Sequence, residues 1–167
     1  TSSGDLTFFL DTAGFRGPQG HTREEIYVLI DAGQLKFRRE NKQSVARLEL
    51  SVKVVSEAGE TAAEETWERT VSVEDEEDIG SSSLPFNDVI GFDLKPGMYQ
   101  ISLTIRDLNG KLSGTSEAAI QVHNFEGKNL TTSNILFASA LEQTNREGRF
   151  AKRGWNVIPN TTRSYMV

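Results

Sequence analysis

The stretch from Phe92 to Val122 restricts the folds open to this chain most sharply, because its side chains alternate between apolar and polar. The apolar parity includes Tyr99, Ile101, Leu103 and Ile105. A period of two places one face of a β-strand on a core and the other face in water. The pair Asn109-Gly110 then predicts a hairpin turn with positive φ, and the alternation resumes after it. We therefore expect a central β-hairpin here.

Similar patterns recur along the first three quarters of the chain. Leu48 to Val54 predicts a long strand with one apolar face, and Thr61 to Val73 predicts its partner, in which we expect Trp67 to fill the core. Glu25 to Asp31 is apolar on both faces, which favours a central or covered strand. A short strand is expected at Leu6 to Leu10, followed by a Gly-rich loop over residues 11–23. Seven or eight strands without a helical period predict an all-β fold, an antiparallel β-sandwich.

The corner before the central hairpin refines this prediction. Leu94-Lys95-Pro96-Gly97-Met98 immediately precedes Tyr99 at the start of a long strand. A Tyr in this position resembles the tyrosine corner of immunoglobulin-like sandwiches. We therefore expect an immunoglobulin-like sandwich in which Tyr99 is largely buried and its hydroxyl bonds to nearby backbone, because a buried phenol without a partner is costly.

The chain changes character after Phe125. Residues 1–126 hold 12 Lys and Arg against 22 Asp and Glu, a net charge of −10, whereas residues 127–167 hold 6 against 2, a net charge of +4. Ser133 to Leu141 suits either one more strand or a short helix. We predict a sandwich over residues 1–125 and a basic, extended C-terminal arm over residues 126–167. The arm is expected to lie partly along the acidic sandwich and to need a neighbour for full ordering.

Composition and motifs argue against several functions. An acidic body disfavours nucleic-acid binding, and no apolar run is long enough to span a membrane. Cysteine is absent, the two histidines lack a second ligand at metal-binding spacing, and the acidic run Glu74 to Asp78 lacks a calcium-loop pattern. No nucleophile motif is present. We expect a protein that is not an enzyme, with no cofactor, no metal site and no small-molecule substrate.

The arm carries the motifs of a family resemblance. The segment FAKRGWNVIPNTTRSY matches a family pattern at Phe150, Lys152, Gly154, Val157, Pro159, Asn160, Arg163 and Tyr165. The strand containing Glu25, Ile26 and Tyr27 and the corner before Tyr99 also match. In these segments the chain resembles bacterial GWxTD-domain proteins, although the motif that names the family is absent. The resemblance implies an exported, envelope-associated bacterial protein, with no catalytic residues to carry over.

These observations predict a non-catalytic structural or protein–protein interaction module. We expect an accessory or stabilising subunit of a periplasmic or cell-envelope, membrane-associated assembly, located in the periplasm or elsewhere outside the cytoplasm with any signal peptide removed. The alternative is a carbohydrate-binding or enzyme-associated β-sandwich domain. Trp and Arg dominate interface energetics, so the partner-binding residues are expected in the arm. The predicted residues are Phe150, Arg153, Trp155, Val157, Ile158, Arg163 and Tyr165.

Overall fold

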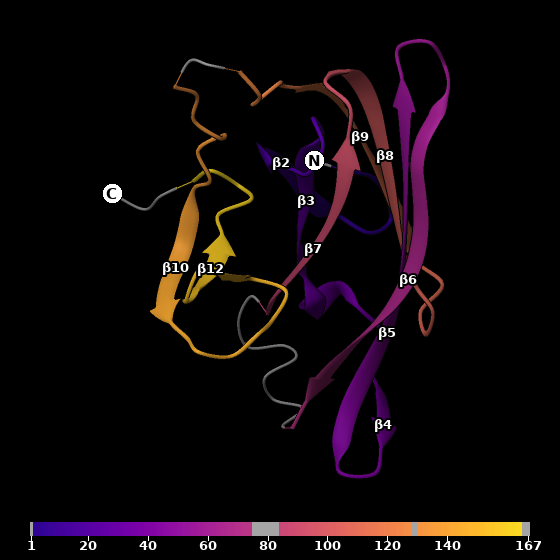
Figure 1. The fold of residues 1–167 in the computed structure, drawn as a ribbon. Helices are drawn as coiled ribbons and strands as arrows, with labels where there is room; N and C mark the ends of the chain where they lie inside the picture. The colour runs from indigo at the N-terminus through magenta and orange to yellow at the C-terminus, as the bar shows by residue number, and fades with distance from the viewer. Residues whose placement is uncertain (1, 75–83, 128–129, 165–167) are drawn as a thin grey trace. The chain divides into compact units, whose positions relative to one another are not determined.

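The computed structural model describes residues 2–74, 84–127 and 130–164, and strands dominate these residues (Figure 1). The chain forms two compact units. Unit 1 comprises Thr1–Phe8, Ile30–Phe86 and Met98–Ile120, and unit 2 comprises Phe9–Leu29, Asn87–Gly97 and Gln121–Val167.

A six-stranded sheet makes up most of unit 1. Its strands are β1 (Ser3–Gly4), β4 (Arg38–Glu40), β5 (Gln43–Ser56), β6 (Thr61–Val73), β8 (Gly97–Asp107) and β9 (Ser113–Val122). The order is β1–β9–β8–β5–β4, and β6 pairs with β5 along the opposite edge. The pairs β1–β9, β4–β5, β5–β6 and β5–β8 are antiparallel. The long strand β5 is therefore the centre of the sheet.

The predicted alternation of β5 and β8 is confirmed by their register. Leu50 lies opposite Ile105, Val52 opposite Leu103 and Val54 opposite Ile101. All six side chains are fully buried. Burying an aliphatic side chain of this size stabilises a fold by roughly 1.5–3 kcal/mol. These cross-strand pairs therefore supply a large part of the apolar stabilisation of unit 1.

The turns differ from one another in their use of glycine. The β5–β6 turn contains Gly59 at φ +82°, a conformation that favours glycine, as the Ala58-Gly59 pair indicates. In the β8–β9 turn, positive φ falls on Lys111 and not on Asn109 or Gly110. The prediction for that turn was wrong in this detail, because the Asp107 carboxylate accepts from the backbone N–H groups of Asn109 and Gly110 and fixes the turn.

Unit 2 contains all of one three-stranded sheet and most of another. The strands are β2 (Phe8–Arg16), β3 (Thr22–Asp31), β7 (Pro85–Leu94), β10 (Ala138–Gln143), β11 (Ala151–Lys152) and β12 (Trp155–Pro159). Their orders are β2–β3–β7 and β10–β12–β11. The apolar β3 is central, as predicted. Residues 11–16 belong to β2, so the loop expected there is wrong, and the arm contains a small antiparallel sheet of its own.

Two aromatic side chains, Tyr99 and Trp67, are less buried than predicted. Tyr99 is half-buried and not largely buried, because it sits at the beginning of β8 opposite Ser56, beyond the fully buried run. Trp67 is also half-buried, because β6 is the last strand of the sheet on its side. The bond predicted for the Tyr99 hydroxyl stays a prediction.

The all-β class with antiparallel sheets is confirmed, and it is consistent with a β-sandwich. The immunoglobulin-like assignment and the boundary at residue 125 stay predictions. A short 3₁₀ turn, Ala32–Gln34, follows β3 in unit 1. Within the described residues, no helix has the length and apolar character needed to cross a membrane.

Candidate functional site

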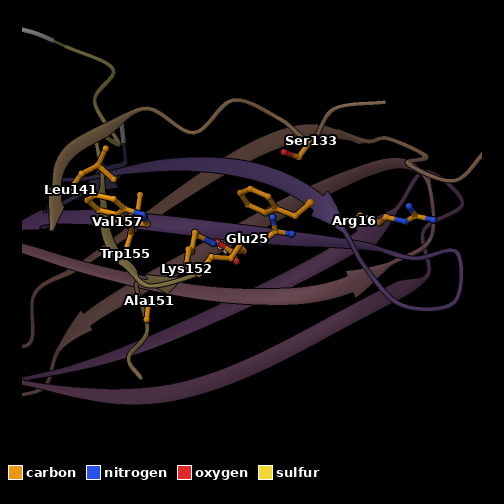
Figure 2. Close-up of a pocket in the computed structure, with 10 residues that line it drawn as sticks. Arg16, Glu25, Ser133, Leu141, Ala151, Lys152, Trp155 and Val157 are labelled. Atoms are coloured by element: carbon orange, nitrogen blue, oxygen red, sulfur yellow. Dashed lines mark hydrogen bonds and ion pairs between the residues drawn. The ribbon is translucent and has the colours of Figure 1, made fainter. Parts of the chain in front are cut away.

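An open pocket of about 860 Å³ in unit 2 is the strongest candidate for a functional site (Figure 2). It is lined from β2, β3 and the arm by Phe15, Arg16, Glu25, Ser133, Leu141, Ala151, Lys152, Arg153, Trp155 and Val157. Figure 2 shows Leu141, Val157 and Trp155 gathered towards one end, Arg16 at the other, and Lys152 with Glu25 between them. We call this the Trp155 pocket.

An ion pair between Lys152 and Glu25 forms the centre of the pocket. The Lys152 Nζ atom lies 2.7 and 2.6 Å from the two carboxylate oxygens of Glu25. The same ammonium lies 4.5 Å from the centroid of the Phe15 ring, a cation–π distance. The buried Tyr27 hydroxyl donates a hydrogen bond to Glu25. Each polar group of this cluster therefore has a partner within the cluster. We call Lys152, Glu25 and Tyr27 the polar scaffold of the pocket, because their contacts hold one another in place.

Burial raises the pKa values of two side chains next to Glu25, those of Tyr27 and Glu24. It raises the pKa of Tyr27 well above its usual value, and the hydrogen bond to Glu25 acts in the same direction. The preceding residue Glu24 is buried, and this burial raises its pKa to about 7. The hydrogen bond from Thr12 lowers the Glu24 pKa, and the charge of Glu25 raises it. Glu24 is thus an acid whose charge changes near neutral pH.

Further polar contacts connect the arm to the rest of unit 2. Arg149 forms an ion pair with Asp88, a carboxylate with no solvent exposure. Arg163 donates to both carboxylate oxygens of Asp11, at 3.0 and 2.7 Å. With Lys152 and Glu25, these pairs join cations of the basic arm to acids of the preceding chain. The expectation that part of the arm lies along the acidic body is confirmed within unit 2.

The arm also approaches the backbone of β2. The Gly14 N–H donates to the Asn134 side-chain oxygen at 3.0 Å, and the Asn134 N–H donates to the Gly14 carbonyl at 3.0 Å. A Cβ atom at Gly14 would lie 2.7 Å from a carboxylate oxygen of Glu24 and 3.0 Å from the Asn134 oxygen. A larger residue at this strand position would therefore displace the side-chain ends of Glu24 and Asn134.

The structure brings three of the predicted partner-binding residues together. Arg153, Trp155 and Val157 line the pocket, and Trp155 remains 43% exposed. Of the others, Phe150 lies under the Arg149 guanidinium and Ile158 pairs with Ala140 in the β10–β12 ladder. Arg163 binds Asp11 and lies 6.0 Å from the Phe137 ring centroid. Tyr165 lies outside the described residues.

Several pocket residues were not predicted as site residues, namely Phe15, Glu25, Leu141 and Lys152. Phe15 was assigned to a loop, and the apolar run before Leu141 did not distinguish strand from helix. A signal for two of them was present, because Glu25 and Lys152 are matched positions of the family resemblance. Their contact joins two motifs that lie 127 residues apart in the sequence.

We expect Lys152→Met to destabilise the protein by about 1–2 kcal/mol, between the values for exposed and buried ion pairs. The substitution keeps most of the side-chain volume and leaves Glu25 without its ammonium partner. Urea unfolding measures the effect, with Lys53→Met on the exposed face of β5 as the matched control. Equal midpoints for the two variants would show that the ion pair does not hold the pocket together.

The described residues contain no group of three or more His, Asp or Glu side chains placed to hold a metal ion. Of the acidic run considered as a calcium loop, Asp75 to Asp78 lie outside the described residues. No protein-family model matches the chain, and no curated protein shows significant similarity to it. The GWxTD resemblance therefore stays an expectation.

Proposed function

We propose that this protein is a non-catalytic interaction module and that the Trp155 pocket receives an extended segment of a protein partner. The observation that carries the proposal is the contrast inside the pocket. Trp155 and Leu141 are 43% and 60% exposed, whereas the central Lys152–Glu25 pair is satisfied by its own neighbours. Exposed aromatic and aliphatic side chains above a fixed polar scaffold are the features of an interface hot spot.

The charges of the pocket define the chemistry of the segment. Glu25 neutralises Lys152, so Arg16 and Arg153 leave the lining with an excess of positive charge. Both arginines are exposed. A complementary segment therefore carries an apolar side chain against Trp155 and Leu141 and acidic side chains next to it, because complementary charges steer association and fix register.

The wider setting of the proposal rests on the family resemblance. The resemblance implies an exported, envelope-associated protein, and in that setting the module would be an accessory or stabilising subunit of a periplasmic or cell-envelope assembly. The three ion pairs that hold the arm support a structural role for it, since they anchor the chain before and after β12, the strand that carries Trp155 and Val157.

A carbohydrate-binding role is the second candidate, and one observation favours it. The exposed Trp155 lies in the same lining as the charged side chains of Arg16 and Arg153, and sugar sites combine aromatic faces with polar groups. Phe15, however, is covered by the Lys152 ammonium, which reduces the aromatic platform. We therefore rank this candidate below protein binding.

The test is a pull-down from native membrane and soluble fractions with three baits, in which each captured protein is identified. The baits are the wild type, Trp155→Ala and the control Leu108→Ala, whose side chain is similarly exposed at 41% in unit 1. We expect a protein retained by the wild type and the control and lost with Trp155→Ala. Equal capture of proteins by all three baits would contradict the proposal. Binding of the wild type to immobilised polysaccharide, with no protein captured, would also contradict it.

A further inference from the structure

Strand β6 forms a long edge of the unit 1 sheet. It is thirteen residues long and, within the described residues, pairs only with β5 (Figure 1). All of its side chains except Val73 are exposed or half-buried. An open edge of this length exposes a row of backbone hydrogen-bonding groups and invites a further strand.

The side chains of β6 divide into two faces. Trp67 lies opposite Leu50 of β5, so it shares the face of the buried core residues. The same face carries Ala63, Glu65, Arg69 and Val71. The other face carries Ala62, Glu64, Thr66, Glu68, Thr70 and Ser72. Arg69 lies 5.9 Å from the Trp67 ring centroid, so the cation and the aromatic ring are already grouped at the middle of the strand.

The sequence of β6 is complementary to itself when read in the antiparallel direction. A two-fold axis through Trp67, the midpoint of Thr61–Val73, pairs every residue of the strand with one in a second copy. On the core-side face it places Trp67 opposite Trp67, Glu65 opposite Arg69, and Ala63 opposite Val71. On the other face it places Glu64 opposite Thr70 and Thr66 opposite Glu68. Opposite charges and aromatic pairs at such positions stabilise a sheet.

Neighbouring registers are unfavourable. In a continuous sheet the two-fold axis that relates the two copies of β6 is perpendicular to the sheet. Residues opposite each other must then lie on the same face, so the axis can pass only at the position of a residue and not between two residues. An axis at Thr66 places Glu64 opposite Glu68. Axes at Glu65, Glu68 and Arg69 place each of these charges opposite its own copy. Like charges directly opposite each other are destabilising, so shifting the axis by one or two residues in either direction is disfavoured.

We propose that β6 pairs with β6 of a second copy of this chain, centred on Trp67, to form a homodimer with one continuous sheet. The contact is isologous, as expected of a two-fold interface. It uses only unit 1 and goes beyond the partner proposed for the Trp155 pocket, so the two proposals succeed or fail separately.

The first experiment measures mass by light scattering across micromolar concentrations. The wild type is expected at twice the 18.5 kDa of one chain. Glu65→Arg places arginine opposite Arg69 and is expected to give monomers, and Glu65→Arg with Arg69→Glu is expected to restore the dimer. Glu64→Arg, opposite Thr70, is the matched control and stays dimeric. A monomeric wild type, or a dimer indifferent to Glu65→Arg, would overturn the proposal.

The second experiment tests the register. The chain contains no cysteine, so a single introduced thiol reports on its own copy. Trp67→Cys places two thiols directly opposite each other and is expected to cross-link on mild oxidation. Thr70→Cys places them about 20 Å apart along the strands and is expected not to, since each residue advances about 3.4 Å. Equal cross-linking of both variants, or of neither, would contradict pairing centred on Trp67.

Discussion

Asp107→Ala is expected to lower the free energy of unfolding by about 3 kcal/mol or more. The Asp107 carboxylate is 1% exposed and accepts hydrogen bonds from the backbone N–H groups of Lys36, Asn109 and Gly110, at 2.7, 2.8 and 3.0 Å. Hydrogen bonds to a charged group contribute about 1.5–3 kcal/mol each, and removing the acceptor leaves buried donors without a partner. The substitution also loosens the turn that holds β8 against β9.

Urea unfolding followed by circular dichroism measures this effect. Glu117→Ala, at an exposed position of β9, is the control and is expected to change stability by less than about 0.5 kcal/mol. A difference between the two variants of less than about 1 kcal/mol would show that the carboxylate is not the anchor of the turn.

Glu24→Gln is expected to stabilise the protein above neutral pH by up to about 3 kcal/mol and to have little effect at pH 4. Burial raises the pKa of Glu24 in the folded protein from 4.5 to about 7. The folded state therefore binds more protons than the unfolded state between these values, so the wild type loses stability as pH rises from about 4.5 to about 7. Glutamine carries no charge at any pH and removes this loss.

The measurement is the difference in unfolding free energy between Glu24→Gln and the wild type at several pH values, because the other acids cancel in the difference. Glu60→Gln in the exposed β5–β6 turn is the control and should show no such trend. A difference that does not grow between pH 4.5 and 7 would mean that Glu24 is charged in the folded protein at acidic pH.

The sequence predicts the parts of the fold in which one strand face is buried and the other is exposed. The alternation of β5 and β8 located Leu50, Val52, Ile101 and Leu103 correctly, because a period of two is a direct consequence of burying one face. The pairing of β5 with β6 followed from the same pattern. The pattern did not show where burial ends: Trp67 is half-buried on the last strand, and Tyr99 is half-buried at the beginning of β8.

Glycine misled the prediction where it serves packing and not turning. The run that includes Gly14 was predicted as a loop, yet Gly14 lies in β2, where its backbone bonds to Asn134 and the side chains of Glu24 and Asn134 approach it closely. Close approach between residues 120 positions apart has no local signal in a sequence. The positive φ in the β8–β9 turn is found at Lys111 and not at the predicted Asn109-Gly110 pair. There the Asp107 side chain fixes the backbone of Asn109 and Gly110.

The candidate site could be predicted in part. Charge balance alone indicated that the basic arm would contact acids of the body, and the exposed Trp155 followed from its polar surroundings. The partners were not predictable, because the Lys152–Glu25 and Arg163–Asp11 pairs join distant segments. The β10–β12 ladder was also missed, since its strands are short and the apolar run Val157-Ile158-Pro159 does not alternate with polar residues.

The affinity of the purified partner for three forms of the protein tests the role of the Trp155 pocket most directly. Isothermal titration calorimetry compares the wild type, Trp155→Ala and Leu108→Ala after circular dichroism confirms that each is folded. Removing a hot-spot Trp costs about 2 kcal/mol or more, so the dissociation constant of Trp155→Ala is expected to rise about 30-fold while Leu108→Ala matches the wild type. Equal dissociation constants for all three forms would contradict partner binding at the Trp155 pocket.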